Sequence, residues 1–194
     1  SLRLALERFT MRRVLLGSVL FLLALMPAAR AEKTHPLLAY VNAPDAAYTW
    51  SKVAETPAPF GGTLTQVALT SQVWQGITWE HNLWVMRPEK MRERPAMLLL
   101  VTGGRGGKPS NEAMLVGSMA ARQGIPFAVL FGIPNQPLFD GKKEDALIAH
   151  TFVQAMQTGD LTWPLLFPMV KSAVRAMDTL QKIAETEWKT PVKG

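Results

Sequence analysis

The sequence predicts an α/β protein with a doubly wound sheet, and three observations support this. Two runs in which apolar and polar residues alternate, 65–69 and 77–85, predict an antiparallel pair of half-buried strands. Two continuously apolar runs follow, 97–101 and 127–131, and such runs are typical of parallel strands covered on both faces. Helical stretches come after each of these apolar runs.

The stretch before the first strand predicts little regular structure. Residues 32–62 are rich in Pro, Ala and Asn and keep neither a two-residue nor a 3.6-residue period. We expect an extended N-terminal segment that Tyr40, Tyr48 and Trp50 hold to the domain, which itself occupies residues 63–194. One face of the second alternating run collects Ile77, Trp79, His81, Leu83 and Val85, and Pro88 ends that run.

The middle of the chain predicts one βαβ unit. The run Met97–Val101 predicts a central strand, and a glycine-rich turn, TGGRGGKP, follows it. A helix is expected from Ser110, a favourable N-cap, to about Arg122, with Gly124 as the stop signal. The second apolar run then returns parallel to the first.

Two further helices are expected after a loop over residues 132–141. The first covers 142–157, and its apolar stripe contains Leu147, Ile148, Phe152, Ala155 and Met156. The second follows the Gly159–Asp160 break, with Pro164 or Pro168 in its first turn. Its apolar face contains Val170, Ala173, Val174, Met177, Leu180 and Ala184. This order of elements opens an α/β hydrolase-like doubly wound sheet, which is incomplete because its C-terminal strands are missing.

Composition excludes several classes of protein. The 194 residues contain no cysteine, which excludes disulfide scaffolds, cysteine zinc sites, thiol nucleophiles and a lipid-anchored N-terminal cysteine. With 48% hydrophobic and 19% charged residues, the chain has enough apolar material for one sizeable core. The formal net charge of +6 would suggest an anionic partner only if the folded part carried it.

Residues 11–31 have the three parts of a secretory signal peptide. An Arg12–Arg13 pair precedes an apolar run, and Pro27 and an Ala-Arg-Ala sequence follow it, which predicts cleavage after Ala31. Residues 1–10 are then translated upstream sequence. The apolar run is too short to span a bilayer, so no stable membrane insertion is expected after cleavage. Residues 32–194 carry 16 basic and 14 acidic side chains, so bulk charge does not predict a nucleic-acid partner.

The glycine-rich turn matches no nucleotide-binding motif. A phosphate-binding loop would need glycine where Thr102 stands and serine or threonine in place of Pro109, so no cofactor is expected. A loop at the carboxyl end of a central strand can instead supply a backbone N–H to an oxyanion hole, and the candidates are Gly103, Gly104 and Arg105. A flexible strand-to-helix turn is an equally weighted interpretation.

No complete catalytic group is visible in the sequence. A Gly-x-Ser-x-Gly elbow is missing, and the three histidines are too scattered to bind a metal. His81 is better explained as a hydrogen-bonded core residue than as a catalytic one. Glu144 and Asp145 suit the start of a helix, and Arg175 suits a local ion pair with Asp178.

Several strings of the sequence together resemble one family. They are Thr70-Ser71-Gln72-Val73-Trp74, Trp79-Glu80-His81, Pro134-Asn135-Gln136-Pro137, the run Glu144–Ala149, and the stretch from Trp163-Pro164 through Pro168-Met169-Val170-Lys171 to Arg175-Ala176-Met177-Asp178. In this order they resemble the PhoPQ-activated pathogenicity-related proteins. The resemblance implies an exported α/β hydrolase-like protein, sometimes linked to virulence or to antimicrobial-peptide resistance.

The resemblance also implies that catalytic residues come later in the family's chains. There, a Gly-x-Ser elbow follows the Arg-Ala-Met-Asp helix, and the acid and the histidine come after it. We therefore expect an inactive N-terminal part of a longer protein, with no catalytic residue present and with the nucleophile, the acid and the histidine beyond Gly194. Asn135 and Gln136 follow the second parallel strand and are expected at the ligand-binding edge of the sheet.

Two functions follow as hypotheses. The longer protein is a serine hydrolase for an ester or amide, with a small-molecule or peptide substrate. Alternatively, it is a non-enzymatic periplasmic or secreted binding protein, with Trp74, Trp84 or Trp163 as exposed contacts, although core packing explains each tryptophan better.

Overall fold

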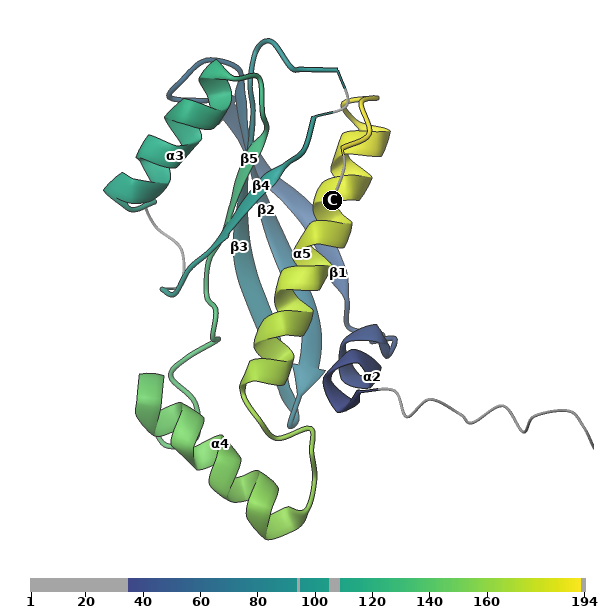
Figure 1. Cartoon of the computed structure of the whole chain (residues 1–194), viewed down its shortest axis with the longest axis vertical. Helices are drawn as coiled ribbons and strands as arrows, with labels where there is room; N and C mark the ends of the chain where they lie inside the picture. The colour runs from purple at the N-terminus through teal and green to yellow at the C-terminus, as the bar shows by residue number, and fades with distance from the viewer. Residues whose placement is uncertain (1–34, 94, 105–108, 193–194) are drawn as a thin grey trace, which may run out of the picture. The chain divides into compact units, whose positions relative to one another are not determined.

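The computed structural model describes residues 35–93, 95–104 and 109–192. The sequence-predicted leader at 11–31, the residues before it, Arg105 and Gly194 lie outside these ranges. Five strands form one mixed sheet in the order β1-β2-β3-β5-β4, with the single parallel pair between β4 and β5 (Figure 1). The elements are α2 (Pro36–Asn42), β1 (Thr49–Pro57), β2 (Thr63–Trp74), β3 (Ile77–Arg87), β4 (Leu98–Val101), α3 (Asn111–Arg122), β5 (Phe127–Leu130), α4 (Glu144–Thr158) and α5 (Leu166–Thr186).

The expected antiparallel pair is present as a long hairpin of β2 and β3. Its two-residue turn, Gln75 and Gly76, has positive φ at both positions, the backbone twist that joins antiparallel strands tightly. Trp79, His81 and Val85 are buried, as the alternation predicts.

The expectation of an extended segment over residues 32–62 needs correction, because this stretch contains helix α2 and strand β1. Pro36 begins α2, and the ring of His35 accepts a hydrogen bond from the Leu37 amide at 3.3 Å. β1 pairs antiparallel with β2 as a third strand, with a register shift between Lys52 and Ala54. The shift breaks the two-residue period that a strand would otherwise show.

The βαβ unit of β4, α3 and β5 is confirmed. Ser110 caps α3, because its hydroxyl accepts a hydrogen bond from the Ala113 amide at 3.2 Å. α3 approaches the sheet closely at Gly117, where a Cβ atom would lie 2.9 Å from the Phe127 ring.

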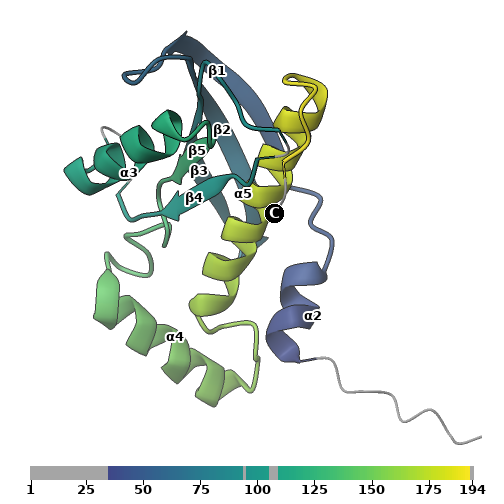
Figure 2. The ribbon, with the colours of Figure 1, turned by 45° about the horizontal axis from the view of Figure 1, so that its top comes forward.

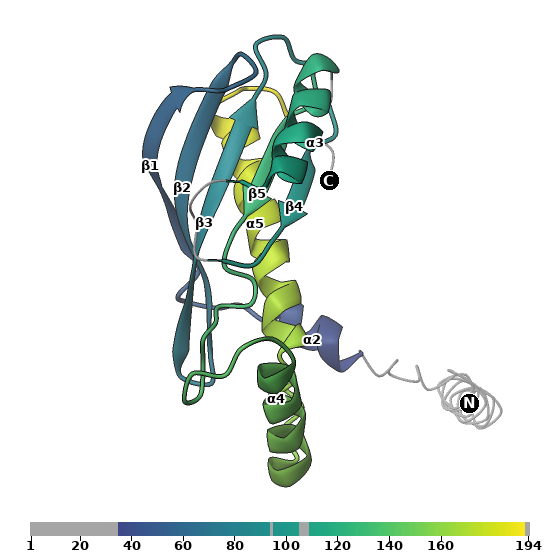
Figure 3. The same cartoon turned by 90° about the vertical axis from the view of Figure 1, so that its left-hand side faces the viewer.

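The prediction that Met97–Val101 forms a central strand is wrong for this chain. Among the described residues, β5 lies between β3 and β4 and is fully buried, whereas β4 pairs on one side only, and Leu98 and Val101 are exposed. Figure 3 shows this order of strands from β1 to β4. An apolar run indicates that a strand can be buried on both faces. It does not show whether the elements that would cover those faces are present.

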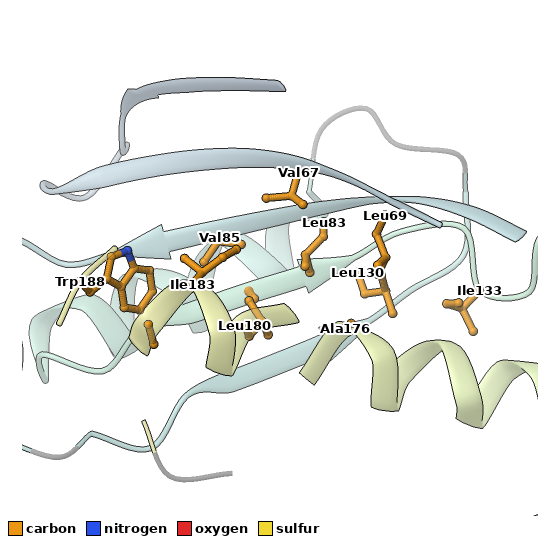
Figure 4. Close-up of a cluster of buried hydrophobic side chains, with 12 residues drawn as sticks. Val67, Leu69, Leu83, Val85, Leu130, Ile133, Ala176, Leu180, Ile183 and Trp188 are labelled. Atoms are coloured by element: carbon orange, nitrogen blue, oxygen red, sulfur yellow. The ribbon is translucent and has the colours of Figure 1, made fainter. Parts of the chain in front are cut away.

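The main core lies between the sheet and α5. Figure 4 shows the side chains from β2, β3 and β5 that meet those of the helix. Its buried members are Val67, Leu69, Leu83, Val85, Ala128, Leu130, Ile133, Ala176, Leu180, Ile183, Ala184 and Trp188. Tyr48 and Trp50 pack against this cluster, so they do hold the N-terminal segment to the domain. α3 covers the opposite face, where its Ala113 and Ala120 cluster with Phe127 of β5.

The expected apolar faces of the last two helices need correction. In α5, Leu180 and Ala184 are buried, but Val170 and Met177 are exposed. In α4, Leu147 is buried against an aromatic group that contains Trp74, Trp79 and Trp163, whereas Phe152 and Met156 are exposed. The helical period defines a broad apolar stripe, and tertiary packing covers only part of it.

Candidate functional site

The loops that leave the two parallel strands lie side by side at their carboxyl ends. The Thr102 amide donates to the Leu130 carbonyl at 2.9 Å, and the Ile133 amide donates to the Thr102 carbonyl at 3.1 Å. These bonds bring the sequence-predicted Gly103 and Gly104 next to the start of the loop after β5. Ligands of open α/β sheets bind at such an edge.

Gly132 lies where three segments converge. A Cβ atom there would stand 3.5 Å from His81 Nδ1 and 3.7 Å from both the Glu80 and Gly104 carbonyl oxygens, and its φ is +78°. The positive φ favours glycine at this position, and the small residue keeps the strand β3 close to both loops. Gly104 also has a positive φ, +75°, and no atom of the described residues beyond its chain neighbours lies within 4 Å of the position of its Cβ.

His81 belongs to a buried polar network. Its Nε2 atom lies 2.9 Å from the Ser71 hydroxyl, which lies 2.8 Å from the Ser172 hydroxyl of α5. Its Nδ1 atom faces the backbone of Phe131 and Gly132 without a well-aligned hydrogen bond. Burial lowers the pKa of His81 to about 4, although the nearby backbone of these two residues opposes that shift. The imidazole is therefore neutral at pH 7.

Ser71 and His81 are the residue types of a nucleophile and its base, but a substrate cannot reach them. Ser71 is fully buried, and its hydroxyl is already engaged by Ser172. A substrate cannot reach this oxygen without opening the interface between β2 and α5. The pair therefore acts as a structural link, as the sequence interpretation of His81 expected. The nucleophile, acid and histidine expected beyond Gly194 stay a prediction, because they would lie outside the 194 residues of this sequence.

Gln72 extends the same network to helix α2. Its amide nitrogen donates to the Pro168 carbonyl at 2.8 Å and to the Ser172 hydroxyl at 2.9 Å. Its amide oxygen accepts a hydrogen bond from the Tyr40 hydroxyl at 2.7 Å. These bonds satisfy buried polar atoms that would otherwise cost about 1–3 kcal/mol each. They fix α2 and α5 against the strand that carries Ser71.

Asn135 and Gln136 both hold the loop after β5 in place. The Asn135 amide donates to the Glu80 carbonyl at 2.9 Å, so Asn135 lies near Gly132 at the same edge of the sheet. Gln136 accepts a hydrogen bond from the Glu144 amide at 2.9 Å and donates to the Glu144 carboxylate. Gln136 therefore anchors the start of α4, a role that the sequence alone did not suggest.

A hollow of about 420 Å³ lies on the sheet face opposite α5. Its floor has two rows across three strands, because Thr49 and Glu80 both pair with Thr70, while Ser51 and Asn82 both pair with Ala68. Phe131 and Gly132 line it as well. The hydroxyl, amide and carboxylate groups can hydrogen-bond a polar ligand. Sequence reasoning missed this hollow because its residues are the outward positions of separate strands.

Other kinds of site find no support in the described part of the chain. Within residues 35–93, 95–104 and 109–192, no group of three or more His, Cys, Asp or Glu side chains could hold a metal. No helix in these same ranges is long and apolar enough to cross a membrane. Trp74 is buried, so it cannot be the exposed contact considered above.

The mixed sheet, its helices and the glycine turn at the carboxyl end of β4 define an α/β protein. The chain belongs to the PhoPQ-activated pathogenicity-related protein family, whose model matches residues 37–194, and this confirms the resemblance seen in the sequence.

Two further similarities were found. One is to autocrine proliferation repressor protein A of Dictyostelium discoideum, with 29% identity over 185 residues that cover 87% of this chain. The chain spans only 37% of that relative's length. The other is to the structure of a glucuronoyl esterase from Solibacter usitatus, with a TM-score of 0.46 and 16% identity over 75% of this chain and 46% of that one.

Proposed function

We propose that this chain is the N-terminal portion of an exported serine hydrolase that cleaves an ester or amide. The observation that carries the proposal is the position of Gly103 and Gly104 beside the loop after β5, at the carboxyl edge of the parallel pair. The chain's coverage of 37% of its relative's length supports a portion of a longer protein, and the family supports the hydrolase-like scaffold.

In this proposal, the glycine turn stabilises the oxyanion of a tetrahedral intermediate. The backbone N–H of Gly104 or Arg105 donates to that oxygen, and none of the described residues beyond its chain neighbours fills the space at the Cβ position of Gly104. The nucleophilic serine, the acid and the catalytic histidine belong to the remainder of the longer protein, beyond Gly194. His81 is not that histidine, because its Nε2 atom lies against Ser71 in the core.

Labelling with a serine-directed fluorophosphonate tests the hydrolase. The protein expressed from the complete reading frame should be labelled and should hydrolyse an activated ester, whereas residues 1–194 alone should do neither. Absence of labelling of the longer protein refutes the proposal.

A glycine substitution tests the oxyanion role. Gly104→Ala keeps the backbone N–H but places a Cβ atom at a positive φ, which should turn that N–H away from the oxyanion. The ester turnover of the longer protein should then fall by up to about 10²-fold, the usual effect of losing one oxyanion donor. Gly159→Ala is the matched control, because Gly159 also has a positive φ, +72°, and no atom within 4 Å of its Cβ position. Equal effects of the two substitutions would assign the loss to backbone strain rather than to catalysis.

Export and a link to virulence are part of the same proposal. The sequence-predicted leader at 11–31 supports export, and so does the name of the Dictyostelium relative, which describes an autocrine factor. The family description supports the link to pathogenicity. Mass spectrometry of the periplasmic or secreted protein should find a mature N-terminus at Glu32. Survival in a cationic antimicrobial peptide should fall when the gene is deleted.

The second candidate is a binding protein on the same scaffold. The polar hollow over β1, β2 and β3 favours it, as does the name of a relative that represses proliferation. Glu80→Gln and Thr70→Val would then abolish the survival effect while Gly104→Ala leaves it unchanged. The reverse pattern favours the hydrolase.

A further inference from the structure

The hollow over β1, β2 and β3 contains a row of three oxygen-bearing side chains. Thr49 pairs with Thr70, and Thr70 pairs with Glu80, so the three residues lie across neighbouring strands on one face of the sheet. Side chains that are paired in this way have Cβ atoms about 5 Å apart. The row therefore places two hydroxyl groups and one carboxylate beside one another in the hollow.

The hollow lies beside an irregularity in the pairing of β2 with β3. Thr70 pairs with Glu80 and Gln72 pairs with Trp79, so Ser71 is an extra residue in β2. A bulge of this kind bends its strand and increases the local twist, and bulges are frequent next to functional sites. We attribute the concave shape of this part of the sheet to that bend.

The charge of the hollow is negative. Apart from the neutral His81, Glu80 is the only ionisable side chain among the described residues that line it, and Glu80 is exposed. None of the ion pairs within the described residues includes the Glu80 carboxylate. A phosphate or a carboxylate would therefore be repelled from the hollow, whereas a cationic group would be attracted.

One wall of the hollow contains a polar atom without a hydrogen-bond partner in the described part of the chain. His81 is 5% exposed, and this atom is its Nδ1. His81 lines the hollow together with Gly132, and the Cβ position of Gly132 lies 3.5 Å from the nitrogen. Because buried polar atoms are rarely left unpaired, a polar group that enters the hollow and pairs with this nitrogen is stabilised.

The hollow reaches the edge of the sheet where the glycine turn lies. The Gly104 carbonyl oxygen is 3.7 Å from the Cβ position of Gly132, which lines the hollow. In Figure 2, α3 and α5 lie on either side of β4, and the residues that line the hollow come from β1, β2, β3 and the segment after β5. A group bound in the hollow would thus lie next to the proposed oxyanion turn.

We propose that this hollow binds a protonated primary amine. An ammonium group has three N–H donors and one positive charge. The Glu80 carboxylate and the Thr70 hydroxyl, on adjacent strands, accept two of these hydrogen bonds, and the carboxylate also balances the charge. The third N–H is left for Thr49, which is next in the row, or for water.

The amine site also narrows the substrate class of the proposed enzyme. This part of the inference rests on the proposal that the longer protein is a serine hydrolase. The substrate would then be an ester or amide that carries an amino group, with that group in the hollow and the carbonyl carbon at the glycine turn. Binding of the amine does not itself require the hydrolase.

Saturation-transfer NMR on the protein expressed from the complete reading frame tests the site without catalysis. The probes are butylammonium, butanol and butyrate, which have similar shapes and differ in charge. We expect a dissociation constant in the millimolar range for butylammonium, as is usual for so small a ligand, and binding at least about 10-fold weaker for the other two. Added salt should weaken the binding of the amine.

Two substitutions assign the binding to the hollow. Glu80→Gln should weaken butylammonium binding by about 10-fold and Thr70→Val by about 3-fold, because a charge-assisted hydrogen bond is the stronger of the two. Glu89→Gln and Thr56→Val are the matched controls, since they remove an exposed carboxylate and an exposed hydroxyl outside the hollow. Both controls should bind the amine like the original protein, and thermal unfolding checks that each variant keeps its fold.

Substrate preference tests the link to the hydrolase. Activated ω-aminoacyl esters of increasing length are compared with alkanoyl esters of the same lengths. At the length that spans from the hollow to the turn, the amino ester should have a kcat/KM at least about 10-fold higher, and Glu80→Gln should remove this preference.

The failures of the two proposals can be told apart. Similar binding of the three probes, tighter binding of butanol, or butylammonium binding that Glu80→Gln leaves unchanged would overturn the amine site. Equal turnover of amino and alkanoyl esters at every length would overturn the assignment of the amine to the substrate. Amine binding without fluorophosphonate labelling refutes only the enzyme, and labelling without amine binding refutes only the amine site.

Discussion

Truncation of Leu180 tests which side of α5 faces the sheet. Leu180 is 3% exposed and belongs to the core against β2, β3 and β5, whereas Met177, one turn earlier, is 41% exposed. Leu180→Ala removes buried methyl groups and leaves a cavity, which costs about 3–5 kcal/mol. Met177→Ala removes a side chain still in contact with water and should cost about 1 kcal/mol or less.

Thermal and urea unfolding of residues 1–194, followed by far-ultraviolet circular dichroism, measures both costs. For a chain of this size, the loss at Leu180 corresponds to a fall in Tm of roughly 10 °C, and that at Met177 to about 3 °C or less. The sequence places both residues on one apolar face and would give them similar costs. Similar costs would therefore refute the packing of α5 described above.

Three further predictions concern a cap, a buried imidazole and a loop anchor. Ser110→Ala should lower the free energy of unfolding by about 1 kcal/mol through the loss of the α3 cap, while Ser118→Ala, whose hydroxyl donates to its own helix at Leu115, should be nearly neutral in the same urea titration. Because burial lowers the pKa of His81 from 6.5 to about 4, the unfolded chain binds a proton that the folded chain does not in this window. The free energy of unfolding should thus be highest above pH 6.5 and fall by about 3 kcal/mol toward pH 4. His81→Gln should remove this part of the fall. A variant with the same pH dependence as the original protein would contradict the assignment to His81. Gln136→Ala should cost about 1 kcal/mol by freeing the start of α4, measured by urea unfolding, and a cost near zero would show that the anchor is dispensable.

Much of the local structure could be predicted because its signals are local. The alternation in β2 and β3 reports one buried face, and Ser110 marks the start of α3. β1 escaped prediction because it is an edge strand whose register shift disrupts its alternation. No local pattern distinguishes such a strand from an extended segment.

The candidate site could be predicted only in part. Gly103 and Gly104 follow an apolar strand, and this placed them at the carboxyl edge of the sheet before their neighbours were known. Their contact with the segment around Gly132 and His81 depends on the antiparallel pairing of β3 with β5, which joins residues far apart in the sequence. The hollow over Thr49, Thr70 and Glu80 depends on register in the same way.

The sequence by itself determined the family, the hairpin, the βαβ unit and the absence of any cysteine chemistry, because motifs, short periods and composition are properties of neighbouring residues. Only the tertiary structure decided that β4 pairs on one side alone within the described residues, that Ser71 is buried against His81, and that α5 buries Leu180 rather than Met177. Burial depends on which elements lie across from a residue, and those elements are distant in the chain. An apolar run shows how much apolar surface a segment could bury. The packing of distant elements determines how much of that surface is in fact buried.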